Sequence, residues 1–335
     1  MEHRSRIAAL VLSIVALLSS LAGRADAQER IKFPVGVGTK TIGTNMFWLA
    51  TKKGFFEEFG LDVQPILLRG SSTTMQALVS ESLYLALGSA DATIGAASSG
   101  ADLLAVGGVV NGLTQTIVAA KQYKTIKDLH GATIGVQVLT SGATNVLKRI
   151  LKQNGLDYPA DYTLLAVGGG NFNLAALVSG QIGATYLVVP LDLMAEQQGF
   201  HVLVDVTDLA GDYPNTSYAT SRTFLKNNPD AVKRFFMAMA TAVHEYKRNP
   251  ELAIKLTQEF LKVKEEPLAK AAYDFYIKVY PDDLRPSTEG IALVLKEFAK
   301  RDPKVASVKP QDIVDTSALD ALAREGFFTK LAATN

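Results

Sequence analysis

The sequence predicts an α/β fold with two lobes, each a mainly parallel sheet flanked by helices, with two hinge crossovers and a helical C-terminal tail. Three observations predict it. Strand-like and helix-like segments alternate from about residue 31, this series starts afresh near residue 128, and the segments after residue 229 have helical periodicity. Such alternation is typical of parallel sheets, because a helix returns the chain to the same edge of the sheet.

The first series contains five apolar runs separated by polar loops and helical segments. Gly54 follows the first helical segment, as glycine commonly does just past a helix end. The predicted strands are residues 31–37, 61–68, 83–87, 103–109 and 116–120, and the predicted helices are residues 45–53, a segment carrying Met75, Leu78 and Val79, and residues 91–99.

The second series follows a turn at residues 128–131. Asn171 is a good helix-capping residue, and Pro190 halts the strand before it. The predicted strands are residues 132–136, 162–167, 182–188, 200–206 and 216–221, and the predicted helices are residues 142–154 and 171–179.

The C-terminal part contains predicted helices without strands. Several begin with Pro or Asn-Pro, which suits a first helical turn because the amide that proline lacks has no partner there. These helices are residues 231–247, 250–261, 267–279, 287–300 and 317–325.

The first 27 residues have the three parts of a secretory signal peptide: the basic residues Arg4 and Arg6, an apolar run over residues 7–21, and small side chains in Ala25-Asp26-Ala27. The run is shorter than the ~20 residues that span a bilayer, which disfavours a membrane anchor. We therefore expect cleavage after Ala27 and a soluble mature protein that does not insert into the membrane.

The composition excludes several classes of protein. The chain has no Cys, so it has neither a disulfide framework nor a lipid-anchored cysteine. An exported protein without a lipid anchor would diffuse freely, so we expect it in the periplasm. The formal charge of +1 comes without a basic stripe, which argues against a nucleic-acid partner.

The two series define the expected domains. Residues 1–27 are the signal peptide, residues 28–115 with about 216–335 form lobe one, and residues 116–215 form lobe two. Crossovers near residues 114–123 and 211–218 would permit rotation of the lobes and restrain sliding. We expect a monomer.

Catalytic and cofactor motifs are scarce. The four His residues lie in unrelated contexts without the spacing of metal ligands. Gly36-Val37-Gly38 follows a strand, but Thr41 stands where the third glycine of a dinucleotide fingerprint belongs. We therefore expect no enzyme activity, no metal and no cofactor.

Polar loops recur between a strand and the following helix in both series. Such loops meet at the carboxyl ends of parallel strands, where ligands bind, and helix N-termini there offer unpaired amides. The same residue types also serve as ordinary helix caps. The candidate ligand-binding residues in these loops are Thr41, Thr44, Ser71, Ser72, Ser89, Ser141, Gly142, Thr144 and Asn171.

Charged and aromatic candidates lie near the same loops. Lys40 and Arg69 could each pair with an acidic group of a ligand, and Arg69 is a candidate ligand-binding residue. Among the aromatic residues, Tyr186, Tyr213 and Tyr218 lie near expected loops or the second crossover, and Tyr218 is a candidate ligand-binding residue. Each of these residues could equally be a solvated or core side chain.

Three stretches resemble one family. ATKKGFFEEFGLDV at residues 50–63 resembles the A-x-x-K-G-F-F-x-x-x-G-L-D-V stretch of the nitrate/sulfonate/taurine solute-binding proteins of ABC transporters. DLHGATIGV at residues 128–136 and AALVSGQIGA at residues 175–184 are similar to further stretches of that family. One departure is Glu81, which stands where many members have glycine.

The resemblance implies a periplasmic-binding-protein fold of the two-crossover kind. Its partners would be a small solute and a permease with its ATPase. It also implies ligand contacts from the polar loops and from Val188 near Pro190. The solute would be small and organic, with an anionic sulfonate-, nitrate- or carboxylate-like group.

Three other functions remain open at this point: a binding protein for a thiamine-pyrimidine precursor or aromatic compound, a sensory ligand-binding protein, and a thiamine-pyrimidine synthase. The absence of Cys argues against the synthase, whose relatives carry a Cys-rich iron-binding segment.

Overall fold

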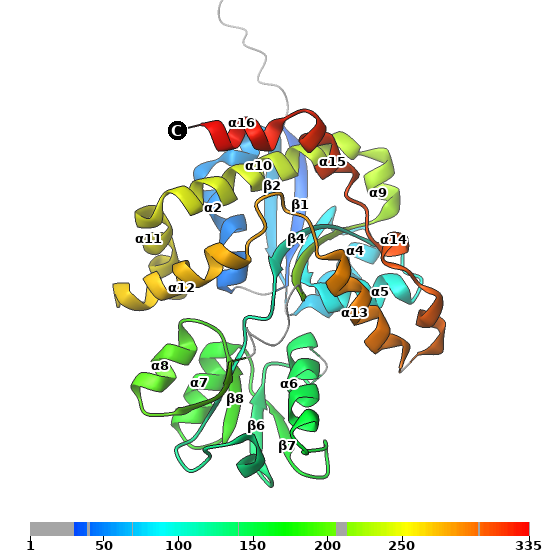
Figure 1. The fold of residues 1–335 in the computed structure, drawn as a ribbon. Coiled ribbons are helices and arrows are strands. Elements are labelled where there is room, and N and C mark those ends of the chain that lie inside the picture. Colours follow the sequence, from blue (N-terminus) through cyan, green and yellow to red (C-terminus); the bar gives the residue numbers. More distant parts are fainter. Residues whose placement is uncertain are drawn as a thin grey trace, which may run out of the picture.

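The computed structural model describes residues 30–38, 41–68, 70–139, 141–205, 213–300 and 302–334. The expected signal peptide, with its cleavage site after Ala27, lies outside the described residues. The chain forms two lobes, a larger one that carries the C-terminal helices and a smaller one built from the middle of the sequence (Figure 1). The predicted fold class is confirmed.

Lobe one is built on a five-stranded sheet with the order β2-β1-β3-β10-β4. Strands β1 and β2 pair in parallel from Ile31 opposite Leu61 to Val37 opposite Leu67. The strands are β1 (Ile31–Val37), β2 (Leu61–Leu67), β3 (Leu85–Ser89), β4 (Leu104–Asn111) and β10 (Pro214–Thr220).

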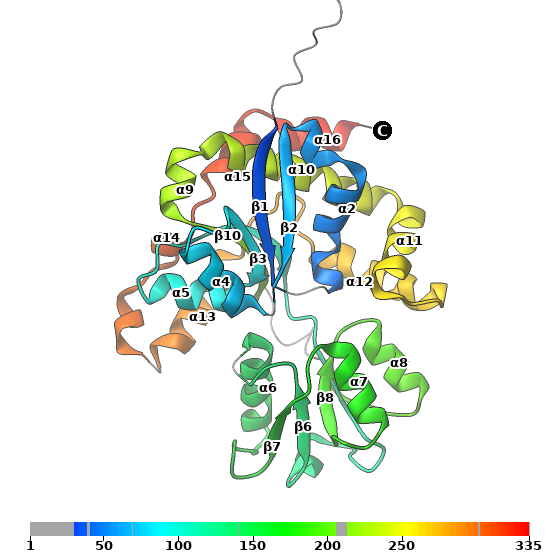
Figure 2. The same ribbon diagram turned by 180° about the vertical axis from the view of Figure 1, so that it is seen from behind.

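Helices cover both faces of this sheet, as the view from behind also shows (Figure 2). The N-terminal ones are η1 (Ile42–Thr44), α2 (Asn45–Lys53), α3 (Phe55–Glu58), α4 (Ser71–Val79) and α5 (Ala90–Ser98). The C-terminal ones are α9 (Arg222–Asn227), α10 (Pro229–Arg248), α11 (Pro250–Leu261), α12 (Glu266–Val279), α13 (Thr288–Ala299), η4 (Pro303–Ser307), α14 (Pro310–Ile313), α15 (Ser317–Arg324) and α16 (Phe327–Ala333).

Lobe two is built on a second five-stranded sheet with the order β7-β6-β8-β5-β9. Its strands are β5 (Thr116–Ala119), β6 (Thr133–Val136), β7 (Thr163–Ala166), β8 (Ala184–Leu187) and β9 (His201–Asp205). Its helices are η2 (Ile126–Leu129), α6 (Gly142–Gln153), α7 (Gly170–Val178) and α8 (Leu191–Gln197).

The two sheets share one topology. In each, the fourth strand of the order is the only antiparallel one: β10 pairs antiparallel with β3 and β4, and β5 pairs antiparallel with β8 and β9. Both inverted strands are the first strand after a crossover between the lobes. The chain therefore enters each sheet by a strand that runs against the rest, and the sheets remain mainly parallel.

Separate hydrophobic cores stabilise the lobes. The core of lobe one includes Phe33, Phe56, Phe235 and Phe236, all fully buried, with Phe33 and Phe56 each stacked on Phe235. A distinct cluster in lobe two includes Ile117 of β5, Ile134 of β6 and Leu147 of α6. Because each lobe buries its own apolar side chains, the lobes can change their relative orientation without exposing either core.

The element bounds differ from the sequence-based prediction by one or two residues at the ends of most strands and helices, and helices α8 and α9 were not predicted. One prediction is wrong: Asn171 does not cap α7, since the capping residue is Gly169 and the helix begins at Gly170. The crossovers occupy residues 112–115 and 206–213, of which 206–212 lie outside the described residues. The domain boundaries at 115/116 and 215/216 stay predictions.

Over the residues that the structure describes, none of the helices combines the length and apolar character that crossing a bilayer requires.

Candidate functional site

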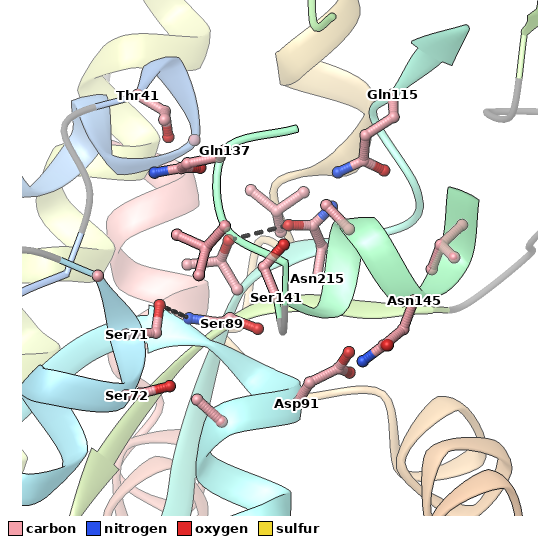
Figure 3. A pocket seen from close by; sticks show the side chains of 18 of the residues that line it. Thr41, Ser71, Ser72, Ser89, Asp91, Gln115, Gln137, Ser141, Asn145 and Asn215 are labelled. Atoms are coloured by element: carbon pink, nitrogen blue, oxygen red, sulfur yellow. Dashed lines mark hydrogen bonds between the residues drawn. The ribbon is translucent and has the colours of Figure 1, made fainter. Parts of the chain in front are cut away.

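A cavity of about 870 Å³ lies between the lobes, where the strand-to-helix loops of both sheets meet. This volume lies within the usual range for small-molecule sites. Both lobes and both crossovers contribute to its walls (Figure 3). A molecule in this cavity would therefore contact both lobes and both crossovers at once.

The N-terminus of α4 forms one wall. Gly70 has φ 92°, a conformation that glycine adopts without strain, and it precedes Ser71, Ser72 and Thr73, which all line the cavity. The backbone amide of Ser89 donates a hydrogen bond of 2.9 Å to Ser71 Oγ (Figure 3). This bond fixes two neighbouring loops to each other, so the wall is preorganised.

Lobe two contributes the N-terminus of α6. Ser141 lines the cavity and caps the helix, its Oγ accepting a hydrogen bond of 3.2 Å from the amide of Thr144. Thr144 Oγ1 donates to the carbonyl of Val138 at 2.7 Å. The amide of Gln137 donates to the hydroxyl of Tyr186 at 3.3 Å. These side chains of lobe two are thus held by hydrogen bonds within lobe two.

The two crossovers contact each other beside the cavity. The amide of Gly112 donates to the carbonyl of Tyr213 at 2.6 Å, and Asn215 Nδ2 donates to Thr114 Oγ1 at 3.4 Å. Thr114, Tyr213 and Asn215 also line the cavity. A ligand here would touch the residues about which the lobes turn.

Asp91 is the acidic residue among the described residues that line the cavity. It lies in the first turn of α5 and is 8% exposed. The Tyr213 hydroxyl donates to both carboxylate oxygens, at 2.8 and 3.0 Å. Burial and then the neighbouring charge of Asp91 raise the pKa of Tyr213 far above its usual value, so the phenol remains a neutral donor.

The remaining lining is a mixture of amides, hydroxyls and apolar surface. Gln115, Gln137, Asn145 and Asn215 can each donate and accept hydrogen bonds. The apolar and aromatic lining residues include Val110, Leu113, Val138, Val146, Tyr186, Leu187, Tyr276 and Phe298. This combination suits an organic molecule that has both apolar surface and hydrogen-bonding groups.

Half of the residues expected to bind a ligand line this cavity. They come from four loops of lobe one and lobe two and from the end of β8. They are Thr41, Ser71, Ser72, Ser89, Ser141 and Val188.

Four expected residues do not line it. Tyr218 is fully buried in the core of lobe one, between Phe235 and Phe236. Thr144 is fully buried, and its hydroxyl bonds to Val138. The remaining two are Thr44, buried with its hydroxyl donating to the Thr41 carbonyl at 2.8 Å, and Asn171, which is exposed beside the lining residue Gly170.

Two further expected residues remain predictions. Arg69 lies outside the described residues, as does Lys40. Gly142 is the first residue of α6 and follows the lining residue Ser141 directly.

Sequence reasoning missed Asp91 and the lining amides of Gln115, Gln137, Asn145 and Asn215. A signal for Asp91 existed, since it lies two residues after the candidate Ser89, in the first turn of the following helix. The amides give no comparable signal, because Asn and Gln occur on any polar surface. Tyr186 and Tyr213, considered among the aromatic candidates, do line the cavity.

Within the described part of the chain, no group of three or more His, Asp or Glu side chains is placed to hold a metal ion.

The chain is similar in sequence to proteins that are named as binding proteins. A family model described as NMT1/THI5 like matches residues 44–253. A protein of Brucella abortus (strain 2308), named as a binding protein, is 28% identical over 248 residues, which is 73% of this chain and 76% of the relative.

Solved structures share the fold. A protein of Bordetella bronchiseptica RB50 superposes with a TM-score of 0.78 at 25% identity, over 89% of this chain and 98% of that one. The alkanesulfonate-binding protein SsuA of Xanthomonas axonopodis pv. citri, bound to MOPS, gives a TM-score of 0.67 at 20% identity, over 86% and 99%. The resemblance inferred from the sequence is therefore confirmed.

Proposed function

Because the chain belongs to the family described as NMT1/THI5 like, we propose that it is a solute-binding protein that delivers a small molecule to an ABC importer. It works in the periplasm after removal of residues 1–27. Its partners are the solute and a permease with its ATPase. The protein performs no chemical step.

The observation that carries this proposal is the cavity between the lobes. Its walls combine loops from both sheets with both crossovers, so a ligand that contacts all of them favours the closed arrangement of the lobes. The residues proposed to contact the solute are those that line the cavity, Thr41, Ser71, Ser72, Ser89, Ser141 and Val188, together with Asp91 and the lining amides.

A binding experiment tests the proposal. Ser72 is exposed and lines the cavity, so Ser72→Trp should fill part of the site while leaving the fold intact. We expect solutes that raise the melting temperature of the wild-type protein, by mass action on the folded state, to bind this variant about tenfold more weakly or worse.

The matched control is Ser307→Trp in η4, where the serine is also exposed. It should bind like the wild type. Equal affinity of both variants would mean that the ligand does not bind in this cavity. Consumption of a solute by the protein would contradict a pure binding function. Stimulation of ATP hydrolysis by the reconstituted transporter would separate import from a sensory role.

A further inference from the structure

The hydroxyl groups that line the cavity differ in whether they can still donate a hydrogen bond. A hydroxyl has one proton and two lone pairs, so a hydroxyl that already donates can only accept from a ligand. A hydroxyl that only accepts retains its proton for a ligand. The hydrogen bonds of Ser71, Ser141 and Tyr186 make this distinction, and so they indicate which ligand groups each side chain can bind.

Tyr186 retains its proton. It lies in β8 opposite Ile117 of β5, its ring belongs to the buried core of lobe two, and it lines the cavity. Its hydroxyl oxygen accepts a hydrogen bond of 3.3 Å from the Gln137 amide, and no group among the described residues accepts its phenolic proton. Buried phenols usually find an acceptor for this proton. A molecule in the cavity can supply that acceptor.

Ser71 is a second donor of this kind, from lobe one. Its Oγ accepts a hydrogen bond of 2.9 Å from the Ser89 amide, which fixes the oxygen at the N-terminus of α4 (Figure 3). Over the part of the chain that the structure describes, the Ser71 hydroxyl donates to no other group. The two donors therefore come from opposite lobes, and a backbone amide holds the oxygen of each.

Ser141 is the opposite case. Thr144 Oγ1 gives its one proton to the Val138 carbonyl, at 2.7 Å. The bond of 2.9 Å between the hydroxyls of Ser141 and Thr144 therefore has Ser141 as its donor. Ser141 also accepts from the Thr144 amide, at 3.2 Å. It retains a lone pair and no proton for a ligand, so it can accept from a solute but cannot donate to one.

We propose that Tyr186 is a specificity-determining residue, which donates its phenolic proton to one acceptor atom of the solute while Ser71 donates to a second acceptor. This inference rests on the proposed function, because it assigns a role to a residue of the same cleft. A solute without these acceptors leaves two polar protons buried and unpaired, which weakens its binding. Because the donors belong to different lobes, a solute with both acceptors also favours closure.

Three uncharged probes of nearly the same shape test this role. Methyl phenyl sulfide, methyl phenyl sulfoxide and methyl phenyl sulfone carry no, one and two acceptor oxygens on the same skeleton. Because none of them is charged, the comparison depends little on the charged residues around the cavity. Dissociation constants are measured by ligand-observed NMR. We expect the wild-type protein to bind the sulfone about tenfold or more tightly than the sulfide, with the sulfoxide between them.

Variants attribute the preference to the two hydroxyls. Tyr186→Phe removes the proton and keeps the ring, so it should lower the sulfone-to-sulfide affinity ratio about three- to tenfold, and Ser71→Ala should do the same. A purely structural role of Tyr186 would weaken both probes equally and leave the ratio unchanged. Tyr162→Phe is the matched control: it removes a buried hydroxyl of lobe two that has no partner among the described residues and does not line the cavity. It should not change the ratio.

The outcomes separate this role from the proposed function. A ratio near one in the wild-type protein, a ratio that Tyr186→Phe does not change, or sulfone binding that Ser72→Trp does not weaken overturns the role of Tyr186. The first measurement does not depend on whether a variant folds. Absence of binding by all three probes, while other solutes bind in the cleft, also overturns the role and leaves the function standing. If no solute binds at all, both proposals fail.

Discussion

Glu81 adopts a backbone conformation that usually belongs to glycine. Its φ is 60°, and the equivalent residue in lobe two, Gly180, has φ 75°. Both follow a helix and begin the same turn: the Ser82 amide donates to Ala77 and the Gln181 amide to Ala176, each at 3.0 Å. Lobe two has glycine at this turn, whereas lobe one retains the turn with a residue that carries a side chain.

Replacing this residue by glycine should stabilise lobe one. A left-handed conformation costs a side-chain-bearing residue about 1–2 kcal/mol, and the extra freedom of glycine in the unfolded chain offsets about 0.5–1 kcal/mol of that. We expect Glu81→Gly to raise the free energy of unfolding by about 0.5–1 kcal/mol, measured by urea denaturation. Glu81→Ala is the control, because alanine also carries a side chain, and it should not raise the free energy of unfolding. An equal rise in Glu81→Ala would mean that removal of the Glu81 charge, rather than the backbone conformation, causes the effect.

Individual side chains explain why the candidate site was only partly predictable. Ser141 and Thr144 lie three residues apart in the same turn, yet the first lines the cavity and the second is turned to the Val138 carbonyl. Asp91 and Tyr213 form a hydrogen bond across 122 residues of sequence. A loop can be located from its composition, but the direction of a side chain depends on partners that only the folded chain supplies.

At the scale of elements, one contact occurs twice. A methyl group at Gly36 in β1 would overlap Cδ1 of Leu83, and one at Gly135 in β6 would overlap Cδ1 of Ile182. Strand β1 therefore passes close to Leu83, just before β3, and strand β6 passes close to Ile182, just before β8. Glycine is required here for close approach rather than for its φ.

This contact predicts a compensating pair of substitutions. Gly135→Ala should lower the free energy of unfolding by about 1–3 kcal/mol because the added methyl overpacks a buried space. Ile182→Val removes the overlapping Cδ1, so the same Gly135→Ala change should cost less in that background. Chemical denaturation of the four members of the double-mutant cycle measures the coupling. Strict additivity would mean that the strand shifts without strain.

The short helix η2 is held by a capping box in which Asp128 accepts hydrogen bonds from the amides of Lys124 and Thr125, at 2.9 and 2.8 Å. These two bonds lower the pKa of Asp128 below its usual value of 3.8, and the bond from Lys124 has the larger effect. A lowered pKa in the folded state means stability that is present above pH 3.8 and is lost as the pH falls through the folded-state pKa.

Asp128→Ala should therefore melt at a lower temperature than the wild type at pH 7. The difference should shrink as the pH falls below about 4, because the wild-type carboxylate becomes protonated and its bonds weaken. Melting curves of both proteins at pH 7, 5 and 3 measure this. A difference that stays constant over that range would show that the carboxylate charge contributes nothing to the cap.

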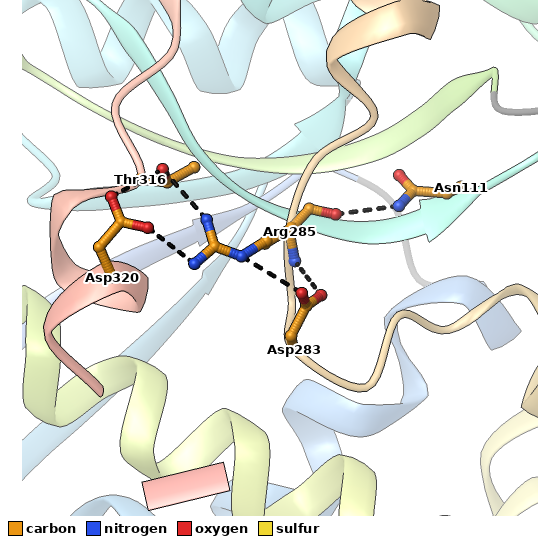
Figure 4. Close-up of polar contacts among 5 residues, drawn as sticks. All are labelled: Asn111, Asp283, Arg285, Thr316 and Asp320. Carbon is orange, nitrogen blue, oxygen red and sulfur yellow. Dashed lines mark hydrogen bonds and ion pairs between the residues drawn. The ribbon is translucent and has the colours of Figure 1, made fainter. Parts of the chain in front are cut away.

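Polar contacts around Arg285 join the segment between α12 and α13 to β4 and to α15 (Figure 4). Arg285 pairs with Asp283 at 3.2 Å and with Asp320 at 2.7 Å. Asn111 at the end of β4 donates to the Arg285 carbonyl at 2.9 Å. The segment between α12 and α13 is thereby fixed beside β4, and α13 is brought to the cavity, where it contributes Phe298.

For the whole molecule, the arrangement of two lobes and two crossovers predicts closure around a ligand. Each lobe has its own core, and the crossovers are bonded to each other by Gly112 and Tyr213. Helices α6 and α13 face each other across the second cavity. Rotation about the crossovers should therefore change the distance between these two helices more than any distance within a lobe.

Spin labels can measure this closure, since the chain has no native Cys. Gln153→Cys on α6 and Lys296→Cys on α13 place labels at exposed positions in different lobes. We expect a bound ligand to shorten and narrow the distance distribution measured by pulsed electron paramagnetic resonance. A control pair within lobe one, Lys53→Cys and Lys296→Cys, should not respond; an unchanged interlobe distance would contradict closure.

The order of strands and helices, the repetition of one series and the polar loops at strand ends follow from the sequence alone, because apolar periodicity and turn residues are local properties. Only the tertiary structure decided that β5 and β10 run against their sheets, that Tyr218 belongs to the core and that Asp91 lines the cavity with Tyr213. Those features depend on contacts between residues far apart in the chain, which no local pattern encodes.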